Sequence, residues 1–178
     1  MQVNSYDPST GTLDVTFWDG LRRELFDVPP ELYVGLQQSE SQTHYFDTHL
    51  WNQGFEHKTH WRDLSDLLRF MEEHMNFEAP CTVRSIRWED TPLHTACVWG
   101  DIEAVRLLLE GGADVNARGD LGCTPLYDAV SFDHVRCVAL LLSAGATGND
   151  ANELNYTARE EALSSENPRM RALFGDHT

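Results

Sequence analysis

The stretch that decides the fold covers residues 91–126 and reads TPLHTACVWGDIEAVRLLLEGGADVNARGDLGCTPL. Its opening Thr91-Pro92-Leu93 returns as Thr124-Pro125-Leu126, and its leucine run Leu107-Leu108-Leu109 returns at the same offset as Leu140-Leu141-Leu142. A further step of the same size reaches Thr157. Self-similarity at this period, about 33 residues, predicts a stack of small units, because one short helix pair cannot bury its apolar face without a neighbour.

Each unit carries the signals that begin and end helices. Thr91 and Thr124 are placed to cap helix N-termini, and a proline follows each at the first helical position, where a missing N–H costs little. Leucine-rich helices come next, with apolar residues at offsets of three and four. Gly112 and Gly145 follow them, where a left-handed residue ends a helix.

This combination of cap, helix, glycine and period resembles the ankyrin repeat. His94 matches the histidine that ties neighbouring repeats by hydrogen bonds in that family. The glycine that closes the first helix is present as Gly100 but is replaced by Asp133, which tolerates the left-handed region less easily. The resemblance implies an all-α stack over residues 61–178 with two clear repeats and degenerate caps: 61–90 as an N-terminal capping helix and loop, 91–123 and 124–156 as the repeats, and 157–178 as a polar capping repeat.

Residues 61–76 predict an amphipathic helix. Leu64, Leu67, Leu68 and Met71 lie at helical spacing, with acidic residues on the other side. Aligning Leu67 with Val105 and Phe70 with Leu108 makes this helix similar to the outer helix of a degenerate repeat. We expect it to cover the N-terminal side of the stack, since at least three units are normally needed for stability.

Residues 1–60 predict a separate, compact α+β domain with a small three-stranded antiparallel sheet and two helices. Alternation of apolar and polar residues indicates a strand over 13–17, preceded by one near 3–6 and followed by one over 21–28. Pro29-Pro30-Glu31 opens a first helix, and residues 45–51 form a second.

This order of elements, with the block Phe26-Asp27-Val28-Pro29-Pro30-Glu31-Leu32-Tyr33, resembles the KTSC domain, a bacterial module. The resemblance covers about residues 3–58 and implies RNA binding as one possible role. The central Tyr-x-Tyr of the family is replaced here by Arg23-Glu24-Leu25. Single-strand binding needs aromatic platforms and a basic track, and both are weakened in this chain.

The chain is acidic, with a formal net charge of −16. Residues 1–60 carry −6, residues 61–88 carry −1 and residues 89–178 carry −9. Such a surface repels phosphate backbones and attracts basic partners, although acidity can also serve solubility alone. No window approaches the ~20 apolar residues of a membrane span, and the N-terminus lacks a secretion signal, so we expect a cytoplasmic protein.

Groups for catalysis or metal binding are weakly indicated. The histidines His44, His49, His57 and His60 lack a convergent ligand pattern, and the four cysteines suit buried free thiols better than zinc or disulfides. Asp14 and Glu24 face each other across a hairpin, but 29 acidic residues produce such pairs by chance. We therefore expect a protein that is not an enzyme, with no cofactor and no metal.

The sequence offers more specific candidate residues for protein binding. In the ankyrin pattern, the two positions before the helix-closing residue face the concave surface, and here they are Val98 and Trp99, then Ser131 and Phe132. The aromatic rings of Trp99 and Phe132 recur one repeat apart, which predicts an exposed pair of anchors. The alternative is that they pack inside the chain. The adjoining turns add further candidates, namely Trp88, Glu89, Asp90, Arg118, Asp120 and Leu121.

These features predict a bacterial interaction module that binds and inhibits another protein through its ankyrin face. A basic toxin is the favoured partner, which would make the chain an immunity protein or antitoxin. A general adaptor and a host-directed effector are alternatives within the same class. The competing class is a nucleic-acid-associated regulator acting through residues 1–60.

Overall fold

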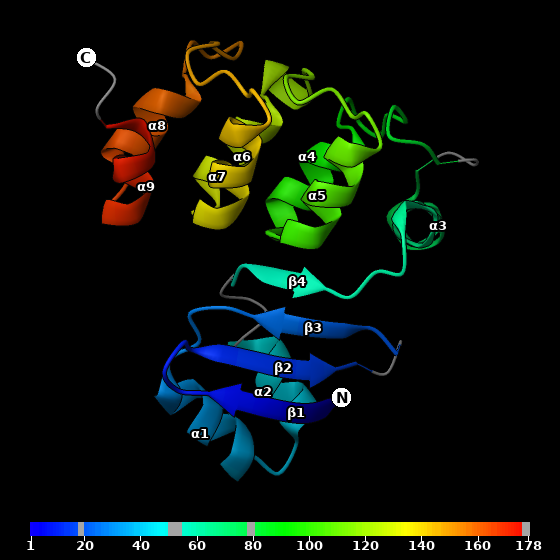
Figure 1. The fold of residues 1–178 in the computed structure, drawn as a ribbon, viewed down its shortest axis with the longest axis vertical. Coiled ribbons are helices and arrows are strands. Elements are labelled where there is room, and N and C mark those ends of the chain that lie inside the picture. Colours follow the sequence, from blue (N-terminus) through cyan, green and yellow to red (C-terminus); the bar gives the residue numbers. More distant parts are fainter. Residues whose placement is uncertain (18–19, 50–54, 78–80, 176–178) are drawn as a thin grey trace. The chain divides into compact units, whose positions relative to one another are not determined.

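The computed structural model describes residues 1–17, 20–49, 55–77 and 81–175, and it divides into two compact units, Met1–His60 and Trp61–Thr178. The first unit combines a sheet with two helices, and the second is a stack of helices (Figure 1). The structure confirms the predicted α+β class and the predicted order, in which a sheet unit precedes a helical stack.

The sheet of the first unit has four strands within the described residues, one more than expected. Strands β1 (Gln2–Asp7), β2 (Thr12–Thr16), β3 (Arg22–Leu25) and β4 (His57–Thr59) lie in that order, and each pairs antiparallel with the next. Strand β4 is three residues long, so it has too few positions to show alternation. Strand β3 ends earlier than predicted, and Asp27 beyond it takes a left-handed conformation at φ +56°.

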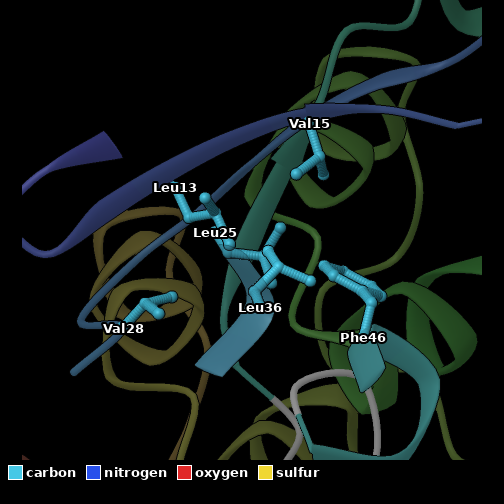
Figure 2. Packing of buried hydrophobic residues seen from close by; sticks show 6 residues of the cluster. All are labelled: Leu13, Val15, Leu25, Val28, Leu36 and Phe46. Atoms are coloured by element: carbon cyan, nitrogen blue, oxygen red, sulfur yellow. The ribbon is translucent and has the colours of Figure 1, made fainter. Parts of the chain in front are cut away.

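Helices α1 (Pro30–Gln38) and α2 (Gln42–His49) cover one face of this sheet. Figure 2 shows Leu25 of β3, Leu36 of α1 and Phe46 of α2 pointing toward one another, and all three are fully buried or nearly so. Gly35 lets the two helices approach, because a Cβ there would collide with the ring of Tyr45. Helix α2 begins three residues before the prediction, and the predicted end at residue 51 lies outside the described residues.

The second unit stacks its helices in two rows (Figure 1). The inner row contains α4 (Pro92–Trp99), α6 (Pro125–Ser131) and α8 (Ala158–Ser164), each packed on the next. The outer row contains α3 (Leu64–Met75), α5 (Ile102–Glu110), α7 (Val135–Ser143) and α9 (Pro168–Phe174), again in order. Helix α3 packs on α5, as expected of an N-terminal cap, and it buries Leu67 and Met71 of the predicted apolar face. Phe70, which the repeat alignment pairs with buried Leu108, is only half-buried.

The predicted caps begin and end the inner helices. Thr91, Thr124 and Thr157 are the N-cap residues, and the Thr124 hydroxyl accepts a hydrogen bond from the N–H of Tyr127 at 3.2 Å. Gly100 closes α4 at φ +70°. Asp133 follows the end of α6 at φ +59°, so the aspartate does adopt the left-handed conformation that the family reserves for glycine.

His94 joins two repeats, as its match to the family histidine predicts. Its Nδ1 accepts a hydrogen bond from the backbone N–H of Thr91 at 3.1 Å, which leaves Nε2 as the protonated nitrogen. Nε2 then donates to the carbonyl oxygen of Cys123 at 3.2 Å. Burial lowers the pKa of His94, so the ring stays neutral and keeps this arrangement at neutral pH.

A second set of bonds between repeats comes from the residues that begin the outer helices. Asp101, His134 and Asn167 occupy this position, each one repeat after the last. The indole N–H of Trp61 donates to Asp101 Oδ2 at 2.9 Å, and His134 Nε2 lies 3.1 Å from the carbonyl oxygen of Val98. Asn167 Nδ2 donates to Asp133 Oδ2 at 2.8 Å. The residue that begins each of these outer helices therefore forms a hydrogen bond with the preceding repeat or cap of the stack.

We predict that Trp61→Phe destabilises the helical stack. The change removes the indole N–H from a buried carboxylate oxygen, which costs about 1–3 kcal/mol of the free energy of unfolding. Urea denaturation followed by far-ultraviolet circular dichroism measures this loss. Trp88→Phe is the matched control, because Trp88 is 79% exposed, and it should stay within about 0.5 kcal/mol of the parent. Equal stabilities for both variants would contradict the role of the Trp61 bond.

Candidate functional site

Three successive turns of the second unit each expose a large apolar side chain at the same position. Trp88, Leu121 and Leu154 follow one another at the spacing of the repeat and are 79%, 45% and 59% exposed. The next residue in each turn has a left-handed backbone, with φ +72° at Glu89, +67° at Gly122 and +66° at Asn155. We call Trp88, Leu121 and Leu154 the fingertip ladder.

The first turn holds its tryptophan in a strained conformation. Arg87 and Asp90 exchange two backbone hydrogen bonds, at 2.8 and 3.0 Å, so that Trp88 and Glu89 form the two-residue turn of a hairpin. Both have positive φ, at +50° and +72°, in a turn that normally takes Asn-Gly. Side chains larger than glycine cost roughly 1–2 kcal/mol each in this region, and such strain is concentrated at functional sites. The guanidinium of Arg87 lies 4.0 Å from the centre of the Trp88 ring and supports it.

Hydrogen bonds connect the turns to one another. The Oδ1 of Asp90 accepts from the N–H of Asp120 at 3.0 Å, and the carbonyl oxygen of Leu121 accepts from the N–H of Glu153 at 2.9 Å. The guanidinium of Arg118 donates to the carbonyl oxygens of Gly122 and Ala151, at 2.7 and 2.8 Å. The three apolar tips are therefore presented on connected backbone, which reduces the entropy lost on binding.

Carboxylates accompany the ladder. Glu89, Asp90, Asp120 and Glu153 belong to the same turns, and Asp128 lies half-buried on the neighbouring helix α6. Burial, and then the nearby charges of Asp90 and Asp120, raise the pKa of Asp128 to about 7. An apolar ladder with acidic neighbours suits a partner that offers both apolar and cationic side chains.

The candidates predicted on the helices have different environments. Phe132 is 54% exposed and Ser131 is also exposed, both at the end of α6. Trp99 is half-buried, and its ring meets the edge of Phe70 on α3 with 6.3 Å between ring centres. Val98 is half-buried too, and its carbonyl oxygen faces His134. The expected pair of exposed rings therefore reduces to Phe132, while Trp99 packs within the stack.

Sequence reasoning identifies Trp88, Glu89, Asp90, Asp120 and Leu121 in the turns but misses Leu154 and Glu153. A signal for both is present, because one further repeat from Leu121 and Asp120 reaches them directly. The loss of proline after Thr157 hides this signal, since it makes the third unit look irregular. The turn geometry nevertheless continues, with Asn155 left-handed like Glu89 and Gly122.

Comparison with protein families agrees with the stacked turns and helices. A family model of ankyrin repeats, in three copies, matches residues 63–153, which is just over half of the chain. The chain belongs to the ankyrin-repeat family. A model of the KTSC domain matches residues 2–55, so the first unit is a KTSC domain. No match was found among curated proteins.

The ankyrin match includes helix α3, which agrees with its interpretation as part of a degenerate repeat. Ankyrin repeats are protein-interaction modules, so this part of the chain is one that binds another protein. The fingertip ladder lies on the turns between ankyrin repeats. None of the helices in the described parts of the chain has the length and hydropathy needed to cross a bilayer.

Other chemically interesting groups have structural roles. Arg22 joins Asp14 through two of its nitrogens, at 2.9 and 2.6 Å, and this contact lowers the pKa of Asp14. Glu24 lies 2.9 Å from His60 Nε2. The thiols of Cys81, Cys97 and Cys137 are buried, whereas that of Cys123 is half-buried. Within residues 1–17, 20–49, 55–77 and 81–175, no group of three His, Cys, Asp or Glu side chains is arranged to hold a metal ion.

We predict that Asp128 makes the ankyrin unit less stable as pH rises from about 4 to 7. Its pKa is raised in the folded chain, so the folded state keeps a proton that the unfolded state releases across this window. The free energy of unfolding therefore falls through the window and levels off above it. Asp128→Asn removes the effect and raises the free energy of unfolding at pH 8 by on the order of 2 kcal/mol.

Urea denaturation at pH 5 and pH 8 tests this prediction. The gain from Asp128→Asn should be complete at pH 8 and clearly smaller at pH 5, where only the first part of the window has been crossed. Glu166→Gln is the control, because Glu166 is exposed in the turn before α9 and its replacement changes the net charge by the same amount. A gain that is independent of pH would show that packing, and not ionisation, is responsible.

Proposed function

We propose that the chain binds a cationic protein through the fingertip ladder and through Phe132 at the C-terminal end of helix α6. The observation that supports this most strongly is the recurrence of exposed Trp88, Leu121 and Leu154 at one position of three connected turns. Exposed apolar residues scattered singly need no explanation, whereas a periodic row does. Phe132, 54% exposed at the end of α6, adds an aromatic anchor on the same repeats.

The distribution of charge supports a basic partner. The whole chain carries −16, and the turns of the ladder add carboxylates from Glu89, Asp90, Asp120 and Glu153. Charges at the rim of an interface steer the encounter and select against partners of like charge, while buried aromatic residues supply much of the affinity. A protein with a basic rim around apolar side chains matches both requirements.

We further propose that binding inhibits the partner in the bacterial cytoplasm, and that the chain itself catalyses no reaction. In this form of the proposal the partner is a basic toxin and the chain is its immunity protein or antitoxin. A general adaptor or a host-directed effector would use the same surface but leave its partner active. An assay of the captured partner with and without the chain separates these roles.

A second candidate function is regulation through nucleic-acid binding by the KTSC unit. The aromatic rings of this unit support that function less well than the ladder supports protein binding. Tyr6 stacks on Tyr33 with 4.4 Å between ring centres, and Tyr45 stacks on His49 at 4.2 Å, so these rings are used inside the unit. Titration of single-stranded RNA at low salt should be flat for the full chain. Saturable binding that weakens as salt rises would favour this candidate instead.

We predict that the combined change Trp88→Ala, Leu121→Ala and Leu154→Ala abolishes capture of the partner by the full chain. Truncating an anchor at the centre of an interface typically costs ~2 kcal/mol or more, or about thirty-fold in affinity. Phe132→Ala should weaken capture by a similar factor. The affinity is measured by calorimetry once chemical crosslinking in the source cell has identified the bound protein.

Leu163→Ala is the matched control for the ladder. Leu163 is 44% exposed on α8, so it resembles Leu121 in exposure but lies outside the ladder. It should leave affinity unchanged. Trp99→Ala is not a clean test, since Trp99 also contacts Phe70 of α3. Equal affinity for the triple variant and the parent would exclude the ladder as the binding surface.

A further inference from the structure

A cavity of about 280 Å³ lies between the repeat 124–156 and the last repeat, and none of its lining residues belongs to the fingertip ladder. It is lined by Leu142 of α7, by Gly148 and Asn149 of the following turn, by Arg159 of α8, and by Leu173 and Phe174 of α9. Its volume corresponds to roughly nine water-sized groups, enough for a ligand of similarly few non-hydrogen atoms. Pockets of this kind bind small molecules when apolar walls surround a few placed polar groups.

The lining of this cavity combines polar and apolar surface, and its apolar part comes from three side chains. Leu142 and Leu173 are half-buried, and Phe174 is 3% exposed. Gly148 lets the Phe174 ring come close, because a Cβ at this position would lie only 3.0 Å from Phe174 Cε1. A larger residue at 148 would therefore press on the ring and narrow the space beside it.

Arg159 is the charged group of the cavity. Its backbone N–H donates to the carbonyl oxygen of Gly148 at 2.9 Å, which places the residue beside the turn. Its guanidinium forms no hydrogen bond or ion pair with any residue that the structure describes. By contrast, Arg106 is paired with Glu103 and Glu110, and Arg118 donates to two carbonyl oxygens.

The acidic residues closest in sequence are engaged elsewhere. Glu160 follows Arg159 directly, but its carboxylate accepts from the N–H and hydroxyl of Thr157 at 3.2 and 2.9 Å. Asp150 accepts a hydrogen bond from the Thr147 hydroxyl. In a chain with a net charge of −16, an arginine that lines a cavity without a described carboxylate partner is unusual. The planar guanidinium group of an arginine can bind a carboxylate through two parallel hydrogen bonds.

We infer that this cavity binds an organic carboxylate with a short apolar tail. The carboxylate pairs with Arg159, and the tail lies against Leu142, Leu173 and Phe174. Two sources offer this chemistry: a free short-chain acid and the C-terminal residue of a peptide that ends in an apolar side chain. A peptide also presents an amide beside the carboxylate, and the side-chain amide of Asn149 can hydrogen-bond to it.

Binding is tested by nuclear magnetic resonance titration of the ¹⁵N-labelled full chain with hexanoate and with N-acetyl-leucine. We expect saturable shifts of the amides near Gly148 and Phe174, with a Kd on the order of 1 mM, as small ligands of this size give. Acetate lacks the tail and 1-hexanol lacks the charge, so each should bind at least tenfold more weakly. N-acetyl-leucine binding tenfold tighter than hexanoate identifies a peptide C-terminus as the source, and the reverse order identifies a free acid.

Variants separate the site from non-specific binding. Arg159→Gln should weaken hexanoate at least tenfold, while Arg84→Gln, an exposed arginine removed from the cavity lining, should not change it. Gly148→Ala should also weaken binding, and its thermal unfolding shows whether α9 remains folded. Arg159→Gln alters no described side-chain contact, so its result stands even if Gly148→Ala unfolds. The absence of saturable binding by both acids, or equal affinity in Arg159→Gln, would overturn the inference.

Discussion

The apolar face of each helix pair in residues 61–175 is covered by the neighbouring pairs, and every other property of this unit depends on that burial. Val105 and Leu108 of α5 recur one repeat later as Val138 and Leu141 of α7, and all four are fully buried. Hydrogen bonds then determine how neighbouring units align, through His94 and through the residues that begin the outer helices. The burial supplies most of the stability, and the bonds supply specificity of alignment.

The same alignment gives the fingertip ladder its geometry. Each turn follows an outer helix and precedes an inner one, so the spacing of the tips follows the spacing of the stacked helices, about 10 Å. A chain that stacked less regularly would expose Trp88, Leu121 and Leu154 as unrelated residues. The strain at Trp88 and Glu89 is tolerated because the Arg87 and Asp90 bonds and the contact of Asp90 with Asp120 support the turn from both sides.

Much of this architecture could be predicted from the sequence because its signals are local and periodic. Thr-Pro pairs, glycines at helix ends and apolar spacing predicted the helices of two repeats, and the Phe26–Tyr33 block led to the KTSC domain. Strand β4 could not be predicted, since a three-residue strand gains its stability from pairing with distant β3. The exposure of the binding candidates on the helices could not be predicted either. Trp99 is half-buried because it packs on Phe70 of α3, a helix that ends at Met75, far from Trp99 in the sequence.

Helix α3 belongs to the outer row, yet no inner helix precedes it in the described residues of its own repeat. Its buried residues Leu67 and Met71 depend on α5, which is complete only at Glu110. At the usual rate of roughly 5–20 residues per second, the ribosome needs about 2–7 s to extend the chain from Met75 to that point. The apolar face of α3 in the nascent chain therefore stays without its partner α5 for several seconds. Chaperones that recognise apolar surface can bind α3 during this interval.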